Sequence, residues 1–125
     1  MAYVNSFYEL EVYQLCRRLA KEIFEISKTF PKEEMYSLTD QIRRSSRSIG
    51  GQVAEAWAKR RYERHFVSKL TDADGEQEET VHWLTTANDC SYITQDVAEN
   101  LTDRYGSVHR MLEAMIAKSS SFCAT

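Results

Sequence analysis

The scarcity of chain-breaking residues is the feature that most limits what this chain can fold into. Its 125 residues include one proline and four glycines, whereas a β fold with many turns needs such residues at most of its corners. Between them, apolar residues recur in alternating steps of four and three, which is the spacing of a helix that buries one face. The sequence therefore predicts an all-α domain, and its length is sufficient for a hydrophobic core.

Four helical segments are predicted, separated by short connections near residues 30, 59 and 91. Ser6 and Glu9 have the spacing of a capping box at the first segment, Pro31 interrupts the helical pattern, and Thr94 is suited to cap the fourth segment. Short connections favour antiparallel neighbours, so we expect an antiparallel up-down-up-down four-helix bundle over residues 1–118. Residues 119–125 show no periodicity and are predicted to form a flexible C-terminal tail. The helices are expected at about residues 6–29, 33–58, 61–89 and 94–118.

Each predicted helix carries one apolar seam that would face the centre of the bundle. The expected core residues are Val12, Cys16, Leu19, Ile23, Ile26 and Phe30; Leu38, Ile42, Ser45, Ile49, Val53 and Ala56; Phe66, Leu70, Ala73, Thr80, Leu84 and Ala87; and Val97, Leu101, Tyr105, Val108, Leu112 and Met115.

A strip of small residues lies on one flank of the second segment. A glycine inside a helix costs about 1 kcal/mol relative to alanine, so the Gly-Gly pair needs a reason. A close helix contact, within the bundle or in a homo-oligomer, would supply one, and a locally weak or kinked helix is the alternative. The residues of this flank are Arg43, Arg47, Gly50, Ala54 and Ala58.

The opposite flank of the same segment is polar. Its residues could form a semi-buried hydrogen-bonded network that fixes one packing arrangement, or an ordinary solvated face. They are Gln41, Arg44, Ser48, Gln52 and Glu55.

Positive charge is concentrated where the second segment meets the third. Residues 40–69 carry a net charge of +5, although the whole chain carries −3. Arginine binds phosphate with two parallel hydrogen bonds, and Trp57 or Tyr62 could stack on a base. The region is therefore a candidate site for RNA or DNA; the alternative is a solvated turn whose cations offset the carbonyl end of the second helix. The candidate binding residues are Lys59, Arg60, Arg61 and Arg64.

Motifs for catalysis or cofactor binding are not found. Glu79 and His82 form one Glu-x-x-His pair, whereas a di-iron bundle needs two, and His65 and His109 have no partner at ligand spacing. Phosphate-binding loops and nucleophile elbows are also missing. We expect no catalytic residue, no metal, no cofactor and no small-molecule substrate, and hence no enzyme.

The chain has no membrane-spanning pattern and no signal-peptide pattern. Its three cysteines are odd in number and far apart, which favours a reduced, cytoplasmic protein.

Residues 30–57 resemble the signature of a known four-helix-bundle family. The resemblance rests on Phe30-Pro31, Glu34, Tyr36, Leu38, Gln41 to Arg44, Ser48-Ile49 and Ala54-Glu55, with Phe66, Leu70, Ala73, Gly75, Glu79 and Leu84 downstream. Members are encoded in intervening sequences of bacterial large-subunit ribosomal RNA genes. The resemblance implies an antiparallel bundle, commonly assembled as a ring of five subunits, with no known catalytic residues. It also implies kinship with accessory proteins of diversity-generating retroelements, which bind nucleic acid and a reverse transcriptase through basic surfaces.

Two positions depart from the family pattern. The usual Asn-Ile-Ala-Glu-Gly is replaced by residues 52–56, Gln-Val-Ala-Glu-Ala, and a usual Gly-Ser pair by Gly75-Glu76. The carboxylate of Glu76 would repel phosphate from the third segment. Two hypotheses remain: a nucleic-acid-associated accessory protein, or an oligomeric scaffold for protein partners without a nucleic-acid role.

Overall fold

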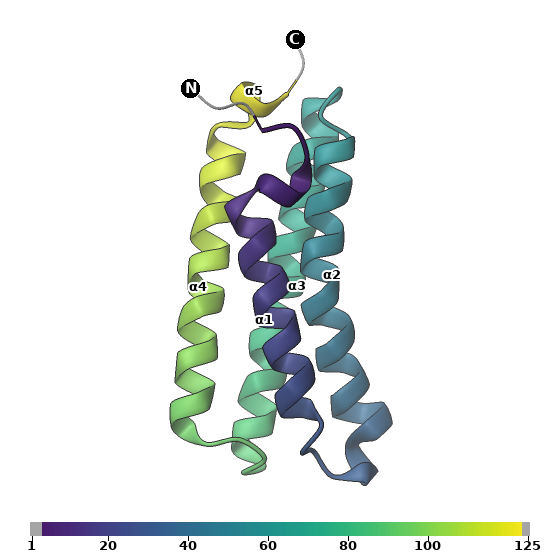
Figure 1. The fold of residues 1–125 in the computed structure, drawn as a ribbon, viewed down its shortest axis with the longest axis vertical. Coiled ribbons are helices and arrows are strands. Elements are labelled where there is room, and N and C mark those ends of the chain that lie inside the picture. Colours follow the sequence, from purple (N-terminus) through teal and green to yellow (C-terminus); the bar gives the residue numbers. More distant parts are fainter. Residues whose placement is uncertain (1–3, 124–125) are drawn as a thin grey trace.

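The computed structural model describes residues 4–123, which contain four long helices and no strand. The long helices lie side by side (Figure 1). Three short helical turns lie before or between the long helices: η1 (Phe7–Glu9), η2 (Lys32–Glu34) and η3 (Met35–Thr39). A short helix, α5 (Ser119–Phe122), ends the described chain. The long helices are α1 (Glu11–Ser27), α2 (Asp40–Ala58), α3 (Glu63–Asp89) and α4 (Gln95–Ala117). The prediction of an all-helical fold with four long helices is confirmed.

Connections between the long helices lie at alternate ends of the bundle. The turn from α2 to α3 is at one end, together with α5, and the other two connections are at the opposite end (Figure 1). The most extensive contact is between α2 and α3, and α1 and α4 share the least extensive of the contacts between adjacent long helices. Within the described residues, no helix has the length and apolar character needed to cross a bilayer.

The apolar seams form the core, with two differences from the predicted set. Ile26 is only partly buried, and Val97 is 36% exposed while Ala98 is buried instead. Val97, Leu101 and Tyr105 are spaced four residues apart. Two such steps in succession exceed two helical turns, so Val97 is rotated away from the buried face of α4. Ala98 keeps the alternation of three and four, so it faces the core.

Small buried side chains let α2 and α3 approach each other closely. Ser45, Ala73 and Thr80 are fully buried, and the hydroxyl oxygens of Ser45 and Thr80 are 2.8 Å apart. Gln77 is also buried at this face, and its amide donates to Glu78 at 2.8 Å. Gln77 stands outside the apolar seam predicted for this helix because it is polar. Pairing of these polar atoms keeps the cost of burying them low.

The start of the first helix was predicted wrongly. The side chain of Ser6 makes no capping bond, and Glu9 instead accepts from the backbone N–H of Asn5 at 2.5 Å. Leu10 is extended, with φ −71° and ψ 127°, and separates the turn η1 from α1. Burial of Leu10 and packing of Phe7 against Tyr13, with ring centroids 4.9 Å apart, account for this break.

The other helix starts follow the prediction more closely. The hydroxyl of Thr94 accepts from the backbone N–H of Val97 at 3.2 Å, so the predicted cap of α4 is confirmed. Helical structure resumes after Pro31, although regular α-helix begins only at Asp40. The intervening turns include the π-helical turn η3, whose wider path buries both Leu38 and Thr39.

The C-terminal segment is more ordered than predicted. Ser119–Phe122 form α5, Ser119 is buried, and the Phe122 ring stacks on Phe66 with centroids 5.8 Å apart. The flexible tail predicted for 119–125 is therefore wrong for these four residues, because Phe122 gains apolar contact by folding back onto the bundle. Residues 124–125 lie outside the described residues.

Candidate nucleic-acid interface

The predicted basic residues lie at the turn between α2 and α3, which we call the basic tip (residues 59–65). The backbone N–H of Lys59 closes the last turn of α2 by donating to Glu55 and Ala56, each at 3.0 Å. Tyr62 then adopts an extended conformation, φ −121° and ψ 105°, and α3 begins at Glu63. A tight turn of this kind brings the side chains of neighbouring positions to the end of the bundle.

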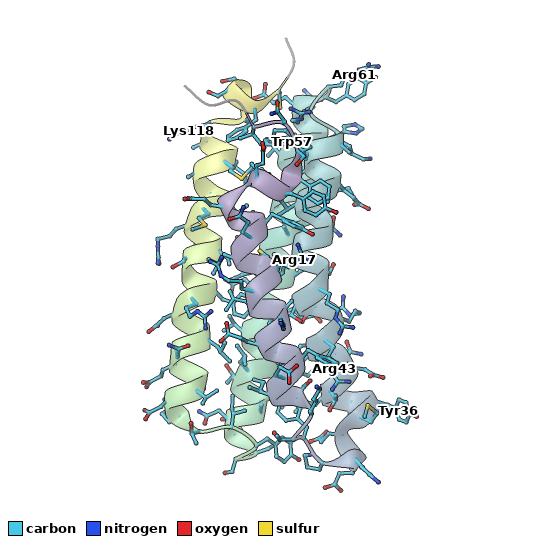
Figure 2. The ribbon with its side chains drawn as sticks, viewed as in Figure 1. Arg17, Tyr36, Arg43, Trp57, Arg61 and Lys118 are labelled. Atoms are coloured by element: carbon cyan, nitrogen blue, oxygen red, sulfur yellow. The ribbon has the colours of Figure 1, made fainter. Side chains whose placement is uncertain are left out.

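Three of the four predicted binding residues are free to reach a ligand. Lys59, Arg61 and Arg64 are exposed, and Figure 2 shows Arg61 pointing away from the end of the bundle. None of the three forms an ion pair with a carboxylate within residues 4–123. Beside them Tyr62 is 58% exposed, and its ring lies 5.5 Å from that of His65.

Arg60 differs from the other three. Its guanidinium carbon lies 3.5 Å from the centroid of the Trp57 ring, and its Nε donates to the backbone oxygen of Trp57 at 2.9 Å. This arrangement holds the side chain against the bundle through a cation–π contact. Arg60 is thus a structural residue of the tip in this conformation, and the three exposed cations are the ones available to phosphate.

The C-terminal helix supports the tip from one side. Ser119 donates to the Glu63 carboxylate at 2.5 Å. Phe122 and Cys123 line a hollow with Trp57, Ala58, Arg60 and Arg61. Burial raises the pKa of the Cys123 thiol. Sequence reasoning missed this support; an aromatic residue, Phe122, in an otherwise polar tail was the available signal.

The small-residue flank of α2 lies against α1. A Cβ at Gly50 would be 3.4 Å from a ring carbon of Tyr13, whereas one at Gly51 would have no neighbour within 4 Å. Gly50, Gly51 and Ala54 contribute to an open hollow of about 240 Å³ between the two helices. Ala58 is exposed and lines the hollow at the tip.

The two arginines of this flank bind residues of α1. The Nε of Arg43 donates to the Ser27 hydroxyl at 2.7 Å. The guanidinium carbons of Arg43 and Arg47 lie 4.8 and 5.3 Å from the centroid of the Phe24 ring. Both cations therefore have partners within the chain.

Two of the predicted polar residues of α2, Arg44 and Glu55, pair with residues of α3. Arg44 pairs with Glu76 at 3.0 Å and with Glu79 at a shorter distance, and Glu55 pairs separately with Lys69 at 2.9 Å. No hydrogen bond links any two of Gln41, Arg44, Ser48, Gln52 and Glu55 in the part of the chain that the structure describes. Each charged member of this flank instead finds its partner on the adjacent helix.

Ion pairing also changes the charge that the Glu76 carboxylate presents to a phosphate. The carboxylate that departs from the family pattern is bound by Arg44, which itself has its pKa raised chiefly by hydrogen bonding to Glu79. An arginine–glutamate pair of this kind offsets the negative charge of α3 near the bundle centre. The basic tip is at the N-terminal end of α3 and the Glu76 pair is more than three turns further along it.

Comparison with known proteins identifies the family. A family model described as 23S rRNA-intervening sequence protein matches residues 8–114. A similar solved structure is that of a protein of unknown function from the S23 ribosomal protein family of Bacteroides thetaiotaomicron, with 26% sequence identity and a TM-score of 0.77. The similarity covers 84% of this chain and 97% of that chain. A search of curated proteins finds no match. The chain belongs to the family of 23S rRNA-intervening sequence proteins.

Proposed function

We propose that this protein is a non-enzymatic accessory protein that binds RNA or DNA through the basic tip. One observation carries the proposal: Lys59, Arg61 and Arg64 are exposed and have no carboxylate partner within the described residues, and the exposed ring of Tyr62 lies among them. Cations that follow a phosphate backbone together with a ring that stacks on a base are the usual elements of a single-stranded nucleic-acid site.

One of the tip cations lies where it disfavours its own helix. Lys59 follows the carbonyl end of α2, where a positive charge is favourable, but Arg64 lies in the first turn of α3. The N-terminus of a helix carries a partial positive charge, so a cation there is unfavourable by about 0.3–1 kcal/mol. Elsewhere Arg44, Lys69 and Arg104 each pair with a glutamate. Binding of an external anion would give the tip cations the partner that the chain does not provide.

The family name directs the choice of probe. Because it refers to 23S rRNA intervening sequences, we propose a structured RNA hairpin with a single-stranded loop as the first ligand to test. Replacing Lys59, Arg61 and Arg64 together with glutamine is expected to lower the affinity at least 10-fold at low salt. Removing three phosphate contacts should also reduce the slope of log K against log salt by about 2. Fluorescence anisotropy across a salt series measures both quantities.

A matched control removes the same charge elsewhere. Arg17, Arg18 and Lys21 are exposed on α1, and their replacement by glutamine is expected to leave most of the affinity and the salt slope intact. An equal loss in both triple variants would show that binding follows net charge and not the tip. No binding by the unmodified protein at low salt would overturn the proposal.

A second proposed function is self-assembly into a homo-oligomeric scaffold. Gly51 supports it, because this helix-interior glycine is exposed and has no neighbour within the chain that requires the absence of a side chain. A backbone of a second copy approaching α2 would account for the cost of about 1 kcal/mol relative to alanine. The family resemblance favours a ring of five subunits. We also propose the antiparallel up-down-up-down order, which the connections at alternate ends of the bundle support (Figure 1).

Substitution of Gly51 by leucine separates assembly from folding. A Cβ at Gly51 meets nothing within 4 Å in the chain, so the variant is expected to fold and to lose assembly because its side chain occupies the contact with the second copy. Gly75→Leu is the control, since a Cβ there also meets nothing within 4 Å. Light scattering after size-exclusion chromatography measures the mass. A monomeric unmodified protein, or a Gly51→Leu variant with unchanged mass, would contradict the scaffold hypothesis.

A further inference from the structure

Three side chains with metal-binding atoms meet between α3 and α4, away from the basic tip. Asp74 comes from α3, and His109 and Glu113 come from α4. One ring nitrogen of His109 and one carboxylate oxygen from each acidic residue all lie within 4.8 Å of one another. The Nδ1 of His109 is already 2.9 and 3.0 Å from the two carboxylate oxygens of Asp74.

The three residues of this cluster come from two separate parts of the chain. Asp74 is 35 positions from His109 in the chain, so sequence spacing does not bring these two residues together. His109 and Glu113 are four residues apart, which places both on one face of a helix. Packing of α3 against α4 adds the third group, Asp74, which sequence spacing did not place near His109.

We propose that Asp74, His109 and Glu113 form a binding site for a divalent transition-metal ion, with Zn²⁺ as the preferred class. Imidazole and carboxylate together suit zinc, which binds such nitrogen and oxygen atoms at about 2.0–2.2 Å. Tetrahedral ligands at that distance are about 3.4 Å apart. The Nδ1 of His109 and the Asp74 oxygens, now 2.9 and 3.0 Å apart, would have to separate by about 0.4 Å to share a tetrahedral ion. The exposed side chain of Glu113 has the freedom to move toward it.

Burial and charge favour a cation at this position. The Asp74 side chain is only 18% exposed, whereas that of His109 is 45% exposed, so the ion would sit at the edge of the bundle with a fourth position open to water. With a neutral imidazole, Asp74 and Glu113 give the site a charge of −2, and Glu78 acts on it as a further nearby carboxylate. A divalent cation would neutralise the two ligating carboxylates, and its binding would release any proton held by His109.

Metal binding would connect two helices that now share only a side-chain contact at this point. An ion that binds the folded chain and not the unfolded chain raises stability by mass action. We expect the melting temperature of the full chain, without added tags, to rise by about 3–5 °C when excess Zn²⁺ replaces EDTA. Isothermal titration with ZnCl₂ should give one ion per chain.

Ligand variants test the assignment. Asp74→Asn, His109→Gln and Glu113→Gln are each expected to weaken Zn²⁺ binding at least 10-fold. Asp72→Asn and His82→Gln make the same chemical changes at exposed positions outside the cluster, and should bind as the unmodified protein does. Circular dichroism checks that each variant remains folded.

Spectroscopy of the unmodified protein tests the assignment even if a ligand variant fails to fold. In the unmodified protein, Zn²⁺ should shift the NMR resonances of the His109 ring nitrogens, and Co²⁺ should show a spectrum without thiolate charge transfer. The absence of saturable binding would overturn the proposal. So would an equal loss of affinity in the two control variants, or a thiolate band in the Co²⁺ spectrum, which would assign the ion to cysteine.

Discussion

Replacing Phe66 with alanine is expected to lower the free energy of unfolding by about 3–5 kcal/mol. Phe66 is fully buried in α3, and its ring stacks on that of Phe122. Removal of the ring takes away apolar contact and leaves a cavity that the packed helices close only in part. The basic tip should be affected as well, because Phe122 would lose the ring that seats α5 beside it. Urea unfolding followed by circular dichroism at one fixed protein concentration measures the change.

Tyr36→Ala provides the control for the loss of an aromatic ring. Tyr36 is 86% exposed, so its removal should change the free energy of unfolding by less than about 0.5 kcal/mol. A loss of less than 1 kcal/mol for Phe66→Ala would contradict the packing described for the tip end of the bundle. If Phe66→Ala also left the hydrogen-exchange protection of Ser119–Phe122 unchanged, contacts other than the Phe66 ring would hold α5 in place.

Trp57→Ala is expected to cost about 3 kcal/mol and to release Arg60. Trp57 is 9% exposed, which leaves most of its ring in contact with the bundle, and its outer face supports the Arg60 guanidinium at 3.5 Å. The substitution removes apolar burial and the cation–π contact together. Chemical denaturation gives the total loss.

Arg60→Gln separates the two contributions. It keeps the indole ring in place and removes the cation together with the Nε hydrogen bond to Trp57, so we expect a loss of about 0.5–1 kcal/mol. If Arg60→Gln cost as much as Trp57→Ala, the ring would contribute little through burial, contrary to its position in the structure.

The buried faces of the helices could be predicted because burial on one side imposes a period on the sequence. Ile42, Ile49 and Val53 illustrate this, since each is fully buried as their spacing indicated. The period does not identify the buried residue at helix ends. Whether Val97 or Ala98 is buried depends on whether the first apolar residue of α4 lies four or three residues before Leu101. The period also fails where the chain is not helical, as at Leu10, whose burial is a result of tertiary packing.

Contacts between helices could not be predicted, because they depend on register. Spacing on α2 indicated that Arg44 and Glu55 share a flank, but their partners are on α3, at positions 76, 79 and 69. Asp74 and His109 are paired for the same reason. The basic tip was easier, because its four cations lie within residues 59–64 of the chain, yet the sequence could not show that Trp57 holds Arg60.

Cys90, the residue that ends α3 opposite the basic tip, gives the protein a ready position for a reporter dye. It is exposed, Cys16 is buried, and Cys123 is partly covered beside the tip. Burial raises the pKa of the Cys16 thiol to about 12, so very little of the reactive thiolate forms there at neutral pH. Once Cys123 is replaced by serine, a maleimide fluorophore should attach only at Cys90. This position is separated from the tip by the 27-residue length of α3. Such a probe would follow ligand binding at one end of the bundle without occupying the surface that the ligand needs.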